Sequence, residues 1–326
     1  MIERRWYSLA RHAMVEALRL VRPAGGGTVL LPTFICRDVV GAVRAAGMRE
    51  AWYEVTADLL PAGLPDARHD VVVAVNYFGI AQDLAPFGAW ARGHGAVVLE
   101  DNAHGWLSRD ASGAVLGERA AIGVTSVRKT IPSPDGALLC VTDPGLARGL
   151  GVAPTPRGGA TPAGWRVRRA AGAAQRTTRL PVFDAMQAAT RLARRARTGS
   201  ALPTTGDEAE TSVPGPAAVH ARSVAMAGAV DSVGESRRRR DLWVHAATEA
   251  GRLGLRPVYA ALPPGAVPYG YPVRAREAQL GALRRAARAT GATLMRWPDL
   301  PSAVRDAAPV HHRDVWLLNF TTWTGR

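Results

Sequence analysis

The chain has 326 residues, and 47% of them are apolar, which is the proportion of a globular protein with a large core. Disorder throughout the chain is therefore excluded. The 41 Lys and Arg against 27 Asp and Glu give a formal net charge of +14. This balance favours nucleic acid, an anionic membrane or a phosphorylated substrate as partner, and composition does not choose among them.

The sequence carries no signal for a membrane or for secretion. No apolar run approaches the ~18 to 20 residues that span a bilayer. The start, M-I-E-R-R-W-Y-S-L-A-R, lacks the continuous apolar core of a secretory signal. A soluble cytoplasmic protein is predicted. Cys36 and Cys140 lack metal-type spacing and are too few for a disulfide framework, so reduced thiols and no metal site are predicted.

Helices and short apolar strands alternate in the first half of the chain. Helical spacing of apolar residues predicts a first helix with Ser8 as its N-cap. The predicted elements are, in order, a helix over 8–21, a strand at 28–32, a helix at 37–46, an extended piece at 50–55, a strand at 71–75, a helix at 83–92, and strands at 96–99 and 137–141. Continuous Val and Leu in the strands are typical of an α/β fold whose parallel sheet is covered by helices on both faces.

The character of the chain changes at residue 151. Residues 151–240 hold 15 Arg against 6 Asp and Glu, and the run R-R-R-R at 237–240 is interpreted as a solvated helix face or an interface. The later predicted elements are helices at 184–197, 221–251 and 276–290 and strands at 257–262 and 293–297, followed by the apolar run V-W-L-L-N-F. We therefore expect a large domain over 1–195, a flexible linker or surface excursion over 196–220, and a connecting helix with a small α+β domain over 221–326.

Lys129 is the only lysine, so 40 of the 41 basic residues are arginine. Such a ratio indicates a compositional drift that replaces lysine wherever a cation is sufficient. An amine can lose its proton and condense with a carbonyl, whereas a guanidinium stays protonated. The surviving lysine therefore indicates Schiff-base chemistry, and chance survival of a surface lysine is the alternative.

Asp101 and Lys129 each follow an apolar segment. Asp101 lies at the end of A-V-V-L, in E-D-N-A-H-G, and Lys129 follows A-I-G-V-T-S-V. Because ligands of parallel sheets bind outside the carboxyl ends of the strands, we expect both side chains at the same rim. A turn or cap residue is the alternative interpretation of Asp101.

Four segments resemble, in this order, the DegT/StrS-type sugar aminotransferases: L-P-T-F-I-C, V-N-Y-F-G, L-E-D-N-A-H-G and T-S-V-R-K-T-I-P-S-P-D-G-A-L-L. The match is strongest over residues 28–142. The resemblance implies the aspartate-aminotransferase fold, with a mostly parallel central sheet and a smaller C-terminal domain. It also implies pyridoxal 5'-phosphate (PLP) as cofactor.

The resemblance assigns roles to six residues. Lys129 would form the internal aldimine and move the proton between substrate and cofactor. Asp101 would bind the pyridinium N–H. The cofactor-binding residues would further be His104, near the phenolic oxygen where the family usually has glutamine; Phe34, stacked on the ring; Ser126, near the phosphate; and Ser8, at the helix start that cradles the phosphate. The alternative for Phe34 is a core aromatic, and the alternative for Ser126 is a hydrogen bond to a neighbouring backbone group.

Two neighbours of these residues receive no role. Arg128 is interpreted as an incidental solvated cation, with a position facing the phosphate as the alternative. Cys36 is interpreted as a buried inert thiol, with a position lining the pocket as the alternative. The Asn/Arg-containing segment that reaches the partner's cofactor in family dimers is not found, and the basic region 151–240 stands in its place.

The predicted function is transamination of a keto group on a sugar nucleotide or cyclitol, with an amino acid as donor. The partners would be these small molecules and a second copy of the chain, with no nucleic acid and no membrane. Two alternatives stay open: a PLP-dependent dehydratase or lyase on the same fold, and a non-catalytic partner subunit. The absence of zinc spacing and of RNA-binding aromatic motifs is the argument against nucleic acid.

Overall fold

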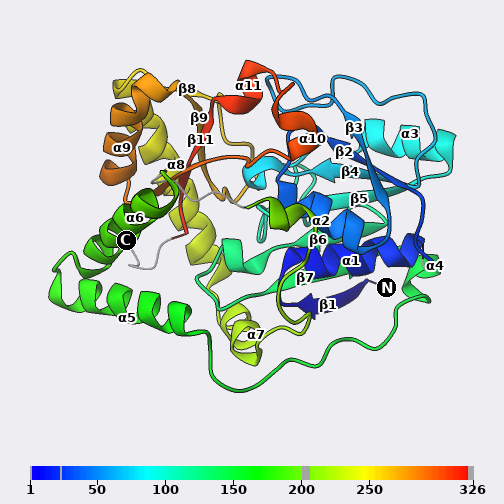
Figure 1. The fold of residues 1–326 in the computed structure, drawn as a ribbon, viewed down its shortest axis with the longest axis horizontal. Helices are drawn as coiled ribbons and strands as arrows, with labels where there is room; N and C mark the ends of the chain where they lie inside the picture. The colour runs from blue at the N-terminus through cyan, green and yellow to red at the C-terminus, as the bar shows by residue number, and fades with distance from the viewer. Residues whose placement is uncertain (1, 23, 200–205, 322–326) are drawn as a thin grey trace.

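The computed structural model describes residues 2–22, 24–199 and 206–321 (Figure 1). A seven-stranded sheet, in the order β1-β7-β6-β5-β4-β2-β3, forms the larger part. Its strands are β1 (Glu3–Tyr7), β2 (Thr28–Pro32), β3 (Arg49–Tyr53), β4 (Val71–Val75), β5 (Val97–Asn102), β6 (Ile122–Thr125) and β7 (Ala137–Val141). Only β7 runs antiparallel to its neighbours, β6 and β1. The predicted α/β fold with a mostly parallel sheet is confirmed.

Short helices accompany this sheet: α1 (Ala10–Val21), α2 (Arg37–Ala45), η1 (Tyr77–Gly79), α3 (Ala85–His94), η2 (Val127–Lys129) and α4 (Pro144–Ala147). Helix α1 packs against β6 and β7 and buries Ala13, Met14, Ala17 and Leu18, the spacing of one helix face. Ser8 does not cap α1, because the N-cap is Leu9 and the Ser8 hydroxyl donates to the Pro216 carbonyl.

A four-stranded antiparallel sheet, in the order β10-β11-β9-β8, forms the smaller part. Its strands and accompanying helices are α7 (Ala221–Gly228), α8 (Ser232–Arg252), β8 (Arg256–Pro257), β9 (Gly270–Arg274), η4 (Glu277–Gln279), α9 (Leu280–Ala289), β10 (Thr293–Arg296), α10 (Ser302–Arg305), α11 (Val310–Arg313) and β11 (Val315–Asn319). The single helix predicted over 221–251 is two helices, because Asp231 caps the second by accepting the Gly234 N–H at 2.9 Å. The strand predicted at 257–262 is reduced to β8.

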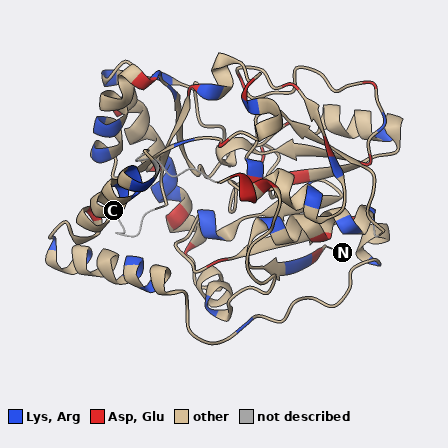
Figure 2. Cartoon of the chain, viewed as in Figure 1, with Lys and Arg blue, Asp and Glu red and all other residues tan. Residues whose placement is uncertain are grey.

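Helices α5 (Ala163–Thr178) and α6 (Val182–Thr198) form a hairpin that projects from the molecule, at the lower left of Figure 1, and carries many arginines (Figure 2). The Trp165 indole at the start of α5 donates to the Pro132 carbonyl at 2.8 Å, so the hairpin base touches the loop after Lys129. Helix α5 was not predicted.

The predicted linker 196–220 lies partly outside the described residues. Within it, η3 (Asp207–Glu210) packs on α2, and Arg37 Nη1 lies 2.6 Å from an Asp207 carboxylate oxygen. The domain boundaries stay a prediction. Across the described parts of the chain, none of the helices combines the length and apolar character needed to cross a membrane.

Candidate active site

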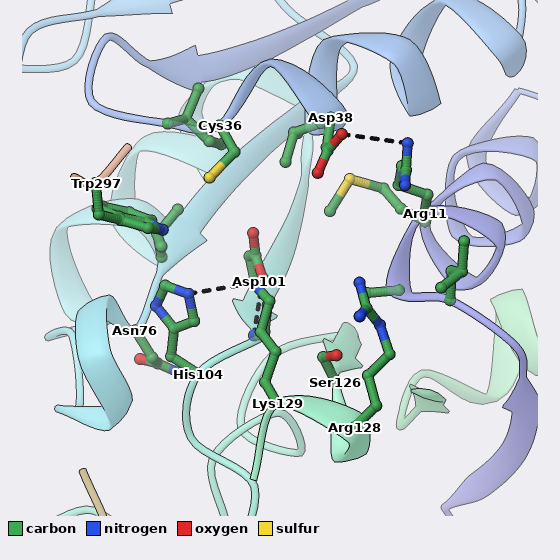
Figure 3. A pocket seen from close by; sticks show the side chains of 17 residues that line it. Arg11, Cys36, Asp38, Asn76, Asp101, His104, Ser126, Arg128, Lys129 and Trp297 are labelled. Carbon is green, nitrogen blue, oxygen red and sulfur yellow. Dashed lines mark hydrogen bonds and ion pairs between the residues drawn. The ribbon is translucent and has the colours of Figure 1, made fainter. Parts of the chain in front are cut away.

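A cavity opens at the carboxyl ends of β4, β5 and β6. Its empty volume, open mouth included, is about 710 Å³. Lys129, Asp101, His104 and Ser126 all line it (Figure 3). Asp101 lies on β5 next to its last residue, and Lys129 ends η2, the single turn that follows β6. The parallel order of β5 and β6 therefore places both side chains at one rim.

The Lys129 amine is held inside this cavity. Its Nζ lies 3.1 Å from His104 Nε2 and 5.8 Å from the centre of the Tyr269 ring. Burial lowers the pKa of the amine, and Arg128 lowers it further, while Cys36 and Asp101 act in the opposite direction. The fraction of free amine, which is the nucleophilic form, is thereby larger than for an exposed lysine at the same pH.

The orientation of His104 indicates the protonation state of Lys129. The imidazole is stacked between Phe78 and Tyr269, with ring centroids at 5.7 and 4.6 Å and interplanar angles of 10°. The Phe78 backbone N–H donates to Nδ1 at 3.2 Å, so Nδ1 carries no proton and the neutral ring carries it on Nε2. The Nε2–H then donates to Nζ, which can accept only as a neutral amine.

Burial keeps His104 itself uncharged. It lowers the pKa of the imidazole well below its ordinary value, and Lys129 adds to this effect. Because the ring is 4% exposed and fixed on both faces, its Nε2–H points at one place in the cavity. A neutral donor of this kind can bind a second acceptor beside the Lys129 amine, such as a phenolic oxygen.

Asp101 presents a carboxylate to the cavity with little compensation from the protein. One oxygen accepts the Ala103 N–H at 2.9 Å, and no ion pair is found for Asp101 within residues 2–22, 24–199 and 206–321. Burial raises the pKa of this carboxyl, although the Ala103 N–H and Lys129 oppose the shift. A cationic N–H donor entering the cavity would therefore be stabilised here.

The neighbouring Glu100 points to the other side of β5 and is fully neutralised. Arg119 lies 2.7 Å from its carboxylate, and the Asn76 side-chain amide donates to the same oxygen at 2.8 Å. This buried network holds the ends of β4 and β5 together and leaves Asp101 as the acidic group on the cavity side.

Phe34 does not line the cavity, so its position does not support the predicted stacking role. Its ring is fully buried and packs against Tyr77 and Trp297, at centroid distances of 5.5 and 5.1 Å. The indole of Trp297 forms the wall in its place, opposite Arg128 in Figure 3. Trp297 follows β10 in the small part of the molecule, so two separate sheets contribute to one cavity.

The two predicted serines are placed differently. Ser126 is 1% exposed, lines the cavity, and its hydroxyl has no hydrogen-bond partner among the described residues. Ser8 lies behind the wall. Its carbonyl accepts the Gly136 N–H at 2.7 Å, and the Gly136 carbonyl accepts the Arg128 N–H at 3.1 Å. Ser8 thus anchors the lysine loop, while Leu9, Ala10 and Arg11 face the cavity.

Arg239 lies in an interface within the molecule, the second of the two interpretations of R-R-R-R, and not on a solvated face. It is 0% exposed, pairs with Glu235 at 2.6 Å, and donates to the carbonyls of Thr130 at 2.5 Å and Pro268 at 2.9 Å. Helix α8 is thereby attached both to the lysine loop and to the segment that carries Tyr269. Nothing in the run of four identical residues distinguished this one from its exposed neighbour Arg237.

Cys36 lines the cavity, and burial raises the pKa of its thiol to about 12. It is therefore protonated and a poor nucleophile near neutral pH, in agreement with its interpretation as an inert thiol. In the described ranges no three side chains gather that could hold a metal ion.

The comparisons with known proteins agree with this architecture. Residues 36–152 match the model of the DegT/DnrJ/EryC1/StrS aminotransferase family. This segment includes Asp101, His104, Ser126 and Lys129. The predicted family resemblance is confirmed. No curated protein matches the chain.

Solved structures match nearly the whole chain at low sequence identity. The aminotransferase TlmJ from Streptoalloteichus hindustanus has a TM-score of 0.63 and 21% identity, with 97% of this chain and 80% of that chain covered. PseC from Helicobacter pylori, an aminotransferase of pseudaminic acid biosynthesis, has a TM-score of 0.61 and 12% identity, with 97% of this chain and 81% of that chain covered.

An E. coli GDP-4-keto-6-deoxy-D-mannose-3-dehydratase with bound hydrated PLP has a TM-score of 0.57 and 11% identity, with 97% of this chain and 82% of that chain covered. These likenesses establish the fold, which is shared by aminotransferases and by a dehydratase. The cofactor predicted from the sequence is the one named in the dehydratase structure.

Proposed function

We propose, with the family match over residues 36–152 as the premise, that this chain is a PLP-dependent aminotransferase. Its substrate would carry a keto group on a sugar nucleotide or a cyclitol, and an amino acid would supply the nitrogen. The observation that carries the proposal is the pairing of a neutral amine, Lys129, with a buried carboxylate, Asp101, across one cavity.

The residues present fit the cofactor. Lys129 would hold it through the aldehyde carbon, Asp101 through the pyridine nitrogen, His104 through the phenolic oxygen and Ser126 near the phosphate. When bound, PLP supplies an aldehyde that captures amines and a ring that accepts an electron pair. The carboxylate of Asp101 answers the positive charge of the ring nitrogen, and burial strengthens that interaction.

The chain's own residues would then transfer protons and exclude water. The Nζ of Lys129 can accept a proton from a substrate carbon and return it to a neighbouring carbon, because its pKa is lowered toward the operating pH. The Nε2–H of His104 remains a fixed donor throughout, since its imidazole does not titrate near neutral pH. Trp297 closes the side of the cavity next to His104 and limits access of water.

A dehydratase is the second candidate, because the matched structures include three of GDP-4-keto-6-deoxymannose-3-dehydratase. Both candidates use the same amine and carboxylate, so they differ in what becomes of the substrate. We further propose a homodimer, as the resemblance implies, which sedimentation velocity can check.

The test begins with the visible absorption of the purified chain loaded with PLP. We expect a band that borohydride removes, with the cofactor then fixed to Lys129 in a peptide map. Lys129→Arg keeps the charge and should abolish the band. A band that survives in this variant would refute the site, and a chain that never captures PLP would favour the non-catalytic alternative.

The reaction type follows from a single turnover. An aminotransferase given an amino acid alone should release one equivalent of 2-oxo acid and accumulate pyridoxamine phosphate. Loss of water from a keto sugar nucleotide would instead identify the dehydratase.

A further inference from the structure

A cationic wall lines the side of the cavity opposite His104 and Trp297. Arg128, the residue before Lys129, and Arg11, from the first turn of α1, extend along this side, and the Ser126 hydroxyl lies between Arg128 and Lys129 (Figure 3). Arg11 pairs with Asp38, its Nη1 lying 3.2 Å from Oδ1. The side chain of Arg128 has neither a hydrogen bond nor an ion pair to any residue that the structure describes.

The side chain of Arg128 is exposed to solvent and lines the cavity. A guanidinium does not give up its proton in proteins, so this charge persists and is available to an anion that enters the cavity. Asp38 forms an ion pair with Arg11 and not with Arg128, and this side therefore keeps an excess positive charge.

Uncharged donors converge on the same place. The backbone N–H groups of Ala10 and Arg11 in the first turn of α1 have no acceptor among the described residues. Ser126 is almost completely buried, and its hydroxyl is unpartnered. Free N–H groups at a helix start, a hydroxyl and a planar guanidinium are together the donor set that binds phosphate oxygens.

The order of side chains along the cavity indicates that the phosphate of the cofactor would bind on this side. From one side to the other it is His104, Lys129, Ser126 and Arg128 (Figure 3). The functional groups of PLP on consecutive ring carbons are a hydroxyl, an aldehyde and a phosphomethyl group. With the aldehyde at Lys129 and the hydroxyl at His104, the phosphate falls on the Arg128 side.

We propose that Arg128 and Arg11, with Ser126 and the first turn of α1, form the phosphate subsite of the cofactor, and that the chain carrying Lys129 supplies the counter-charge itself. This inference rests on the proposed function. It gives Arg128 a binding role in place of the incidental one expected from the sequence. It also explains how phosphate is held although the segment that would reach in from a partner is not recognisable in this sequence.

The phosphoryl group could also belong to a nucleoside diphosphate substrate. Affinities are therefore measured separately for PLP, for pyridoxal, which lacks the phosphate, and for UDP and GDP, by absorption and intrinsic fluorescence titrations on the full chain. Wild type is compared with Arg128→Gln and Arg128→Lys. Arg284→Gln, at an exposed arginine on α9, is the matched control.

Arg128→Gln should weaken PLP binding by about 10- to 100-fold, the size of a lost charge-assisted hydrogen bond, and should leave pyridoxal binding unchanged. Arg128→Lys should lose less, because the charge is kept without the planar fork. Inorganic phosphate should compete with PLP in wild type and less well in Arg128→Gln. Circular dichroism and urea unfolding of each variant separate binding from folding.

Several outcomes would overturn the inference. Unchanged PLP affinity in Arg128→Gln would remove Arg128 from the subsite. Weaker UDP or GDP binding with normal PLP binding would assign the wall to the substrate. Wild type that holds pyridoxal as tightly as PLP would refute the subsite and leave aldehyde capture by Lys129 intact, whereas capture of neither aldehyde would refute the proposed function.

Discussion

The contact between His104 and Lys129 makes a prediction about the only amine on a side chain of this protein. His104→Phe keeps an aromatic ring in the stack between Phe78 and Tyr269 but removes the Nε2–H that donates to Nζ. That donor stabilises the neutral amine, so its removal should raise the pKa of Lys129. Burial, the main cause of the lowered pKa, is unchanged by the substitution.

The size of the shift follows from the lost hydrogen bond. A hydrogen bond of this kind contributes about 0.5–1.5 kcal/mol, and one pKa unit corresponds to about 1.4 kcal/mol, so the pKa of Lys129 should rise by about 0.4 to 1 unit. The Phe78 N–H loses its acceptor in the variant, which should lower the free energy of unfolding by about 1–3 kcal/mol.

The chain offers an unusually direct assay, because ¹³C-labelled lysine gives a single Cε resonance whose pH titration belongs to Lys129. Wild type should titrate below the ordinary value of about 10.4. His94→Phe, at a histidine of α3 that contacts Trp90 and Asp66, is the matched control and should not move the midpoint. An ordinary pKa in wild type, or a variant whose midpoint stays or falls, would refute the neutral-amine argument.

Two further substitutions test the supports of the site. The raised pKa of Asp101 means that the folded state holds the proton to higher pH than the unfolded state, so stability falls as pH rises above about 3.9 through the folded pKa. Asp101→Asn should therefore be at least as stable as wild type in urea at pH 7 and lose cofactor binding, and a variant less stable at that pH would contradict the sign. Arg239→Met leaves the buried Thr130 and Pro268 carbonyls without their donor, while Glu235 keeps its ion pair with Arg238 at 2.8 Å, and should lower the free energy of unfolding by about 1–3 kcal/mol. The exposed Arg237→Gln should change it by under about 0.5 kcal/mol, and equal effects of the two would show that Arg239 is not a structural attachment.

The rim of the sheet could be predicted because its residues depend on local sequence and strand order. The run Val71–Val75 is buried throughout, as continuous Val is expected to be between two parallel neighbours. Asp101 and Lys129 follow adjacent parallel strands, so their shared location required no knowledge of side-chain packing.

Elements whose environment is tertiary could not be predicted in this way. Strand β1 has the sequence E-R-R-W-Y, which lacks an apolar run, and it forms because β7 offers it an antiparallel edge. Helix α5 has few buried residues, so no apolar periodicity marked it, and Trp165 is the main apolar side chain that it buries.

The same limit applies to the cavity walls. Trp297, at the end of the predicted strand 293–297, and Tyr269 reach the lysine from the small sheet, and nothing in the sequence marks either ring as part of a cavity wall. Phe34 had the expected residue type at the expected place in the chain, yet Trp297 stands between its ring and the cavity side of His104. The order of the strands therefore predicts where Asp101 and Lys129 lie, whereas the positions of Trp297 and Tyr269 depend on how the two sheets pack.

The single lysine and the arginine beside it show why these two positions are chemically distinct. An arginine at 129 would carry a permanent charge into contact with the His104 Nε2–H and could not act as a nucleophile. A lysine at 128 would keep the charge but lacks the planar fork with which a guanidinium binds two phosphate oxygens. A drift that converts lysine to arginine is therefore tolerated, even favoured, at 128 and is opposed at 129.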